Sequence, residues 1–130
     1  MNLDELVATM PFAVHAGVEL TAADKAECRG RMAWDPERVT LGGAMHGGAL
    51  MTLADSVGAV CAFLNLPEGA GTSTLSSSTN LLRAVREGYV EAVSRPLHVG
   101  RTTIVVVTEV RDTAGRLVTS TTQTQAVLSG

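Results

Sequence analysis

The residues of this chain best suited to chemistry lie between His46 and Asp55, where His-Gly-Gly is followed by an apolar run and one carboxylate. The first N–H groups of an α-helix have no partners within the helix, and the helix dipole is positive there. Gly47 and Gly48 could therefore hold developing negative charge. A carboxylate on an otherwise apolar helix is costly to bury unless it has a partner or a role. An oxyanion site together with a carboxylate is what acyl transfer to water needs.

The spacing of these groups adds a constraint. Gly47 and Asp55 are eight residues apart, which is roughly 12 Å along an α-helix at a rise of about 1.5 Å per residue. This distance is too long for both groups to act on one carbonyl. If both contact the same substrate, one of them must come from a second subunit.

The elements that must position these residues are one long helix and a set of strands. Hydrophobic periodicity predicts a short helix near residues 3–7, a strand within 26–34, a loop to His46 and a helix over about 47–64. Strand-like runs follow at about 72–82, 89–97, 102–111 and 117–128. Short glycine-containing connections between them favour antiparallel pairing. We therefore expect one α+β domain over residues 1–130, with the helix packed on an antiparallel sheet of five to six strands.

The long helix also argues for assembly. One stripe at helical spacing should pack against the sheet and consists of Leu50, Leu53, Val57, Cys61 and Leu64. The other side carries no Lys or Glu and consists of Gly48, Thr52, Asp55, Ala59 and Ala62, flanked by Met51 and Phe63. A helix that is apolar nearly all round is buried on both sides, so a second copy of the chain is the expected cover.

The His-Gly-Gly motif with Asp nine residues after the His resembles the helix signature of hotdog-fold acyl-CoA thioesterases, of the phenylacetyl-CoA and 4-hydroxybenzoyl-CoA thioesterase type. Segments 86–88, 95–101 and 112–116 agree, and the resemblance covers roughly residues 12–128. It implies a sheet wrapped around one central helix and assembly as a dimer or dimer of dimers. It also implies hydrolysis of an acyl-CoA to free acid and CoA, with no cofactor beyond the CoA of the substrate.

The resemblance assigns roles to individual residues. Asp55 would be the general base on water or a nucleophile that forms a mixed anhydride, and the residues leave both open. The N–H of Gly47 would polarise the thioester carbonyl, with Gly48 beside it. His46 belongs to the signature as a supporting residue that fixes the loop before the helix by hydrogen bonding.

Two positions depart from the family pattern. Many members carry Asn or Gln six residues before the His, where this chain has Thr40, whose side chain is shorter and has no amide. Members with Glu as the carboxylate tend to place Ser or Thr one turn after it, where this chain has Ala59. We expect Ser73 or Thr74 on the following strand to supply the missing hydroxyl.

A thioester suits this sparse set of groups because thiols, with a pKa near 8.5, leave readily without a general acid. Apolar residues would line a slot for the acyl chain between subunits, and arginines would contact the phosphates of CoA. For any single arginine, a solvated strand end is an equal alternative. The candidate substrate-binding residues are Met51, Phe63 and Leu81 for the acyl chain and Arg83, Arg86, Arg95 and Arg101 for the phosphates.

Two other functions stay open. An acyl-thioester hydratase or dehydratase of the same fold would use His46 and Asp55 as a pair, although the Pro-rich segment typical of the dehydratases is missing. A non-catalytic acyl-CoA-binding protein would fit the departures at Thr40 and Ala59. A serine hydrolase is not supported, because no G-x-S-x-G motif occurs.

Charge and composition argue against several classes of partner. The net charge of −3 gives no reason to expect nucleic acid. The first ten residues contain no basic residue, and no apolar run is expected to reach the length of a membrane span. The two cysteines lack metal-type spacing, which favours reduced structural thiols, and the three histidines show no zinc-ligand spacing. We therefore expect a cytoplasmic protein with no metal and no membrane partner.

Overall fold

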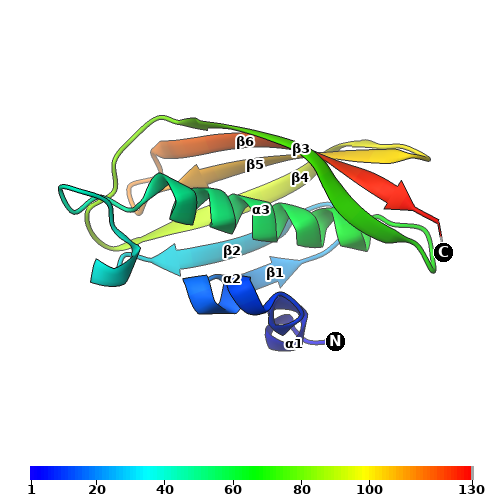
Figure 1. Ribbon diagram of the computed structural model, residues 1–130, viewed down its shortest axis with the longest axis horizontal. Helices are drawn as coiled ribbons and strands as arrows, with labels where there is room; N and C mark the ends of the chain where they lie inside the picture. Colours follow the sequence, from blue (N-terminus) through cyan, green and yellow to red (C-terminus); the bar gives the residue numbers. More distant parts are fainter. Residues whose placement is uncertain (130) are drawn as a thin grey trace.

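The computed structural model describes residues 1–129, which form a six-stranded antiparallel sheet with one long helix on one face (Figure 1). The strands run in the order β1-β2-β4-β5-β6-β3, so β1 and β3 are the edges. Along the chain the elements are α1 (Leu3–Ala8), α2 (Pro11–Ala16), β1 (Glu19–Ala23), β2 (Cys28–Ala33), the 3-10 helix η1 (Pro36–Arg38), α3 (Gly47–Leu64), β3 (Gly71–Leu81), β4 (Tyr89–Val99), β5 (Thr103–Arg111) and β6 (Leu117–Leu128).

The expected long helix is confirmed at both ends, and the four later strands are confirmed to within two residues. The second short helix, α2, was not expected. Pro11 ends α1 in the sequence pattern, but it is also the first residue of α2, a position at which its missing N–H costs nothing. Gly17 closes α2 in the left-handed conformation, with φ of 93°. One proline therefore separates two helices where the pattern suggested a single helix and a loop.

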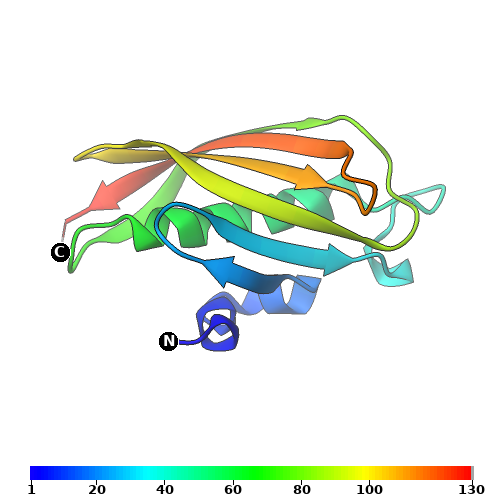
Figure 2. The ribbon, with the colours of Figure 1, turned by 180° about the vertical axis from the view of Figure 1, so that it is seen from behind.

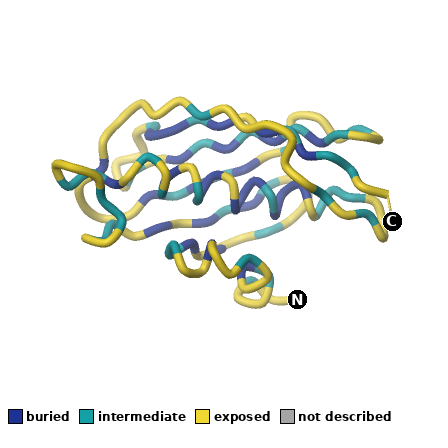
Figure 3. Tube along the Cα trace, in the orientation of Figure 1, coloured by how far each residue is buried: buried dark blue, intermediate teal, exposed yellow. Residues whose placement is uncertain are grey.

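The core lies between α3 and the inner face of the sheet. Along β5, Ile104, Val106, Thr108 and Val110 are buried and alternate with half-buried residues, as expected for a strand with one face covered. Leu53 of α3 packs here without exposed surface, which stabilises the fold by about 1.5–3 kcal/mol for a side chain of this kind. Figure 3 shows the buried residues of α3 facing the sheet and exposed residues facing away from it.

Part of this core is polar. Its buried polar residues come from α3, β4, β5 and β6 and are Ser56, Ser94, Thr108, Thr119, Thr121, Gln123 and Gln125. Most of them are hydrogen-bonded, for example Ser94 to Thr108 at 2.6 Å. Buried polar side chains are costly when unpaired, so a polar layer beneath a helix needs an explanation beyond packing.

The length of α3 corrects one expectation. With 18 residues and an apolar composition, α3 is long and apolar enough to cross a membrane, although no such run was expected. Half of the helix is buried inside the protein against the sheet, as in the core helix of a globular domain. The apolar composition that makes α3 resemble a membrane span also allows it to pack as the central helix of the core.

The edge strand β3 has a free side. It pairs with β6 along nearly its whole length, and most of its residues are exposed. An edge strand with an unpaired row of backbone groups is a template for a further strand. Figures 1 and 2 show β3 at one border of the sheet, and the back face of the sheet has no helix over it in residues 1–129.

Candidate active site

The start of α3 is held by His46. His46 is the N-cap of α3, and its Nδ1 accepts a hydrogen bond of 2.8 Å from the N–H of Gly48. This confirms that His46 fixes the entry to the helix. It also corrects the expectation of two free donors, because the N–H of Gly48 is already used. Since Nδ1 accepts this bond, a neutral His46 carries its proton on Nε2 and presents a donor there rather than a base.

The N–H of Gly47 is the remaining donor at this end. Within residues 1–129 it has no hydrogen-bond acceptor. The side chain of Leu81, at the end of β3, lies close by, because a Cβ added to Gly47 would be 2.9 Å from Leu81 Cδ1. This places Leu81 beside the candidate oxyanion donor, as expected for a residue that contacts the acyl group.

The Asp55 carboxylate lies two turns further along α3, on the flank of the helix that borders α2 and β3. In the single chain its side chain is exposed, but it lines an open pocket of about 480 Å³ between α3, α2 and β3. The pocket is lined by Met10, Pro11, Phe12, Ala13, Met51, Thr52, Asp55, Ser56 and Ser77. Burial by the surrounding protein atoms raises the pKa of Asp55 above its ordinary value. A carboxylate with a raised pKa is a better proton acceptor near neutral pH.

The acyl-chain residues separate into two groups. Met51 lines the Asp55 pocket, whereas Phe63 lies two turns beyond Asp55 and does not line it. Phe12 of α2, which the sequence pattern did not single out, lines both this pocket and a second one of about 690 Å³ that reaches His46 and Gly48. Phe12 therefore connects the mostly apolar pocket at Asp55 with a pocket at the helix start that is also lined by the charged residues Glu37 and Arg38.

The hydroxyl expected beside Asp55 comes from a different residue. Thr74 accepts a hydrogen bond from Gln125 at 2.8 Å, not from the Asp55 region. Ser73 is one residue out of phase with Thr74, so its side chain lies on the opposite face of the sheet. A β-bulge between Thr74 and Ser76 shifts the register, and Ser77 lines the Asp55 pocket instead. No sequence rule would have located that bulge.

The hydrogen-bond partner of Asp55 within the chain is also unexpected. Nε2 of Gln123, on β6, lies 3.5 Å from Oδ1 of Asp55. The two residues are 68 positions apart, so only the fold brings them together. Thr40 lies in an exposed turn before α3, where its backbone bonds to Ala44 and Gly43.

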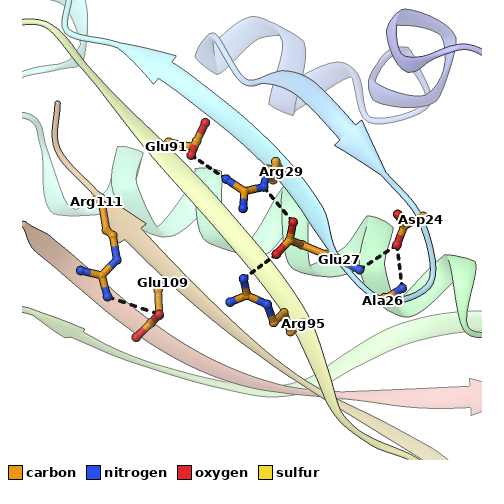
Figure 4. Close-up of polar contacts among 8 residues, drawn as sticks. All are labelled: Asp24, Ala26, Glu27, Arg29, Glu91, Arg95, Glu109 and Arg111. Carbon is orange, nitrogen blue, oxygen red and sulfur yellow. Dashed lines mark hydrogen bonds and ion pairs between the residues drawn. The ribbon is translucent and has the colours of Figure 1, made fainter. Parts of the chain in front are cut away.

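The four arginines do not form one cluster. Arg95 donates to Glu27, which also accepts from Arg29, on the face of the sheet opposite α3 (Figure 4). Arg101 lies in the β4–β5 turn, and Arg86 lies before the other end of β4. The strand has 11 residues, so it spans roughly 35 Å at about 3.3 Å per residue.

The other two arginines lie in a segment that contacts the loop before α3. Arg83 and Arg86 fall in the connection from β3 to β4, where Val85 accepts a hydrogen bond from the N–H of Met45, just before α3. Arg86 lines a small pocket with Asp112, Thr113 and Arg116. The four arginines are close in sequence but not in space, because the two ends of a strand lie far apart and successive side chains point to opposite faces of the sheet.

Three further titratable side chains, His15, Glu37 and Arg38, line the pocket that reaches His46. The structure holds no group of three or more His, Cys, Asp or Glu side chains that could bind a metal within residues 1–129. Cys28 and Cys61 are both free and buried between β2 and α3.

A six-stranded antiparallel sheet around one long helix is the hotdog fold. The chain belongs to the thioesterase superfamily, whose family model matches residues 42–119. That match includes the His-Gly-Gly motif, Asp55 and the strands β3, β4 and β5.

Similar proteins agree with this placement. A thioesterase from Haemophilus influenzae has a solved structure that covers 99% of this chain and 92% of its own, at 27% identity and a TM-score of 0.93. The 1,4-dihydroxy-2-naphthoyl-CoA hydrolase of Escherichia coli is 38% identical over 66% of this chain and 63% of its own length. A Vibrio cholerae protein that carries an esterase name is 41% identical over 65% of this chain and 57% of its own. The matched part thus spans less than two thirds of these last two relatives.

Proposed function

We propose that the chain is an acyl-CoA thioesterase that works as a dimer, with Asp55 of one copy acting on a carbonyl held by Gly47 of the other. The observation that carries the proposal is the placement of both groups on α3: a desolvated carboxylate in a mostly apolar pocket and an N–H without an acceptor at the helix start. The Escherichia coli relative is named as the hydrolase of a CoA thioester, which supports acyl-CoA as the substrate class.

The second copy follows from the geometry. Residues eight positions apart on one helix are separated by roughly 12 Å, so they cannot share one carbonyl within a chain. If β3 pairs with β3 of the partner about a two-fold axis, the sheet continues across both chains and the two α3 helices run antiparallel. The start of one helix then approaches the middle of the other. A dimer of dimers would add a second such pair.

The chemistry needs no cofactor. The Asp55 carboxylate takes a proton from water, the resulting hydroxide attacks the carbonyl carbon, and the N–H of Gly47 stabilises the oxygen that becomes negative. The C–S bond then breaks, and the CoA thiolate leaves without a general acid because its thiol pKa is near 8.5. Alternatively, Asp55 attacks the carbonyl itself and water hydrolyses the mixed anhydride. The products are the same acid and CoA in both cases.

The rest of the site fits this substrate. Met51, Phe12 and Leu81 offer apolar contacts for the acyl group, and Arg83 and Arg86 in the connection from β3 to β4 can meet the phosphates of CoA. His46 does not fit the base of a hydratase, because its Nδ1 is occupied by Gly48.

The proposal is tested by thiol release from a panel of aromatic, short-chain and long-chain acyl-CoA thioesters. We expect turnover with at least one class and a reduction of kcat/KM by about 10²–10⁴ in Asp55→Asn. A change in enoyl absorbance without thiol release would indicate a hydratase instead, and tight binding without turnover would indicate a binding protein. Full activity in Asp55→Asn would reject the assigned role of the carboxylate.

A further inference from the structure

Gln123 of β6 is a buried polar residue that has no role in the proposed thioesterase reaction described above. Its side chain has no exposed surface, although it carries a long amide. Its Nε2 lies 3.5 Å from Oδ1 of Asp55, and within residues 1–129 its Oε1 has no hydrogen-bond partner. The only hydrogen bond of this amide is therefore the one to the carboxylate. A buried amide with half of its capacity unused is unfavourable for folding alone.

A glycine makes room for that amide. Gly58 lies three residues after Asp55 in the middle of α3, where glycine weakens a helix relative to alanine. A Cβ at this position would lie only 1.9 Å from Oε1 of Gln123 and 3.2 Å from Oγ1 of Thr108. No side chain fits at position 58 while Gln123 holds its present conformation. The missing side chain of Gly58 is thus the space through which the Gln123 amide passes to Asp55.

The orientation of the amide follows from charge. The carbonyl oxygen of Gln123 would be repelled by an ionised carboxylate, whereas its NH₂ group can donate to it. The Asp55 pocket offers no competing ion, because its other lining residues carry no titratable side chain. Among the donors of the described residues, the Gln123 amide is the one within hydrogen-bond distance of the Asp55 carboxylate.

We propose that Gln123 is a positioning residue for Asp55, which donates a hydrogen bond to the carboxylate from beneath α3, and that Gly58 keeps the space for it. The inference rests on the proposed function of Asp55. Donation to the ionised form fixes one carboxylate oxygen and leaves the other directed at the substrate. At 3.5 Å the contact is long, and desolvation of Asp55 still raises its pKa above the ordinary value.

The test compares three variants. Gln123→Met keeps the length of the side chain and removes the donor, and Gly58→Ala keeps the amide and displaces it. The matched control is Gln125→Met, because Gln125 is equally buried two residues further along β6 but bonds to Thr72 and Thr74. All three lose or disturb buried polar contacts, but only the first two act on Asp55.

The primary measurement is an NMR titration of the Asp55 carboxyl carbon, which does not depend on activity. We expect its pKa to rise by about half a unit in Gln123→Met and Gly58→Ala and to stay unchanged in Gln125→Met. The acid limb of kcat should move by the same amount, with kcat reduced about tenfold and KM little changed.

The outcomes separate this inference from the proposed function. An unchanged titration in both Gln123→Met and Gly58→Ala would overturn the positioning role, even if the wild-type protein is an active thioesterase. A raised pKa in a protein that releases no thiol would keep the contact and reject the thioesterase. If Gln123→Met does not fold, Gly58→Ala alone decides, since it retains every polar group of the core.

Discussion

The Nδ1 atom of His46 accepts a hydrogen bond from the N–H of Gly48 at 2.8 Å, and this bond leaves Gly47 as the one free donor at the start of α3. The imidazole therefore divides the two glycines of the motif into a structural and a functional one. In the proposed mechanism, His46 acts through the helix that it caps, and the substrate carbonyl accepts a hydrogen bond from the N–H of Gly47.

The first prediction concerns this cap. His46→Ala should lower the free energy of unfolding by about 1 kcal/mol, the usual cost of losing an N-cap, whereas His46→Asn should retain most of it because Asn caps well. Chemical denaturation of the three proteins measures the difference. Equal losses of activity in both variants, without a loss of stability in either, would instead assign His46 a direct part in the reaction.

The second prediction removes the free donor with little change to the helix. Gly47 is the first residue of α3, a position that favours proline, and proline has no N–H. Gly47→Pro should reduce kcat by about 10²–10³, the effect of deleting one oxyanion donor. Gly47→Ala is the matched control: it keeps the N–H and asks only the flexible, half-exposed Leu81 side chain to move. Equal activity in both variants would show that the N–H plays no part.

The third prediction follows from the raised pKa of Asp55. A carboxyl whose folded pKa lies above its unfolded value, about 3.9, favours the folded state most below that pH, and this contribution is lost as pH rises through the folded pKa. Asp55→Asn cannot ionise, so it should unfold at a higher temperature than the wild type at pH 7, with the difference shrinking below pH 4. Thermal unfolding across pH measures this.

The Asp55 carboxyl should also determine how activity depends on pH. Asp55→Asn should reduce kcat/KM by about 10²–10⁴, and the acid limb of the wild-type profile should lie above the ordinary pKa of Asp. A wild-type acid limb at or below pH 3.9 would contradict the desolvated environment of the group.

The fourth prediction addresses the β3 edge. Leu75 of β3 is 64% exposed on the free border of the sheet, and Leu97 of β4 is 69% exposed on an interior strand. Leu75→Lys should dissociate the dimer and remove activity, since a lysine on an edge strand opposes further pairing. Leu97→Lys, a change of the same kind, should leave the dimer formed. Light scattering after size-exclusion chromatography distinguishes the two.

The fold could be predicted from the sequence wherever one period dominates. Leu53, Val57 and Cys61 repeat at helical spacing, and Ile104, Val106 and Val110 alternate at strand spacing, so both elements follow from local pattern. The helix α2 could not, because a proline that begins a helix looks the same as one that ends a helix.

The site was less predictable than the fold. His46, Gly47 and Asp55 lie on one helix, so their spacing fixed their arrangement. Ser77 reaches the pocket only because a bulge shifts β3, and Gln123 only because β6 passes beneath Asp55. The predicted cluster of four arginines was wrong for a related reason. Arg95 lies on the face of the sheet opposite α3, and Arg101 follows the far end of β4. Contacts between distant segments are set by register and topology, which the local pattern does not contain.

The most direct test of the shared site mixes two inactive proteins. Asp55→Asn and Gly47→Pro are co-expressed with different tags, and the heterodimer is purified and assayed for thiol release. If each site combines Asp55 of one copy with Gly47 of the other, the heterodimer has one doubly defective site and one intact site, and it should regain about half of the wild-type activity. A heterodimer as inactive as its parents would contradict a site built across two chains.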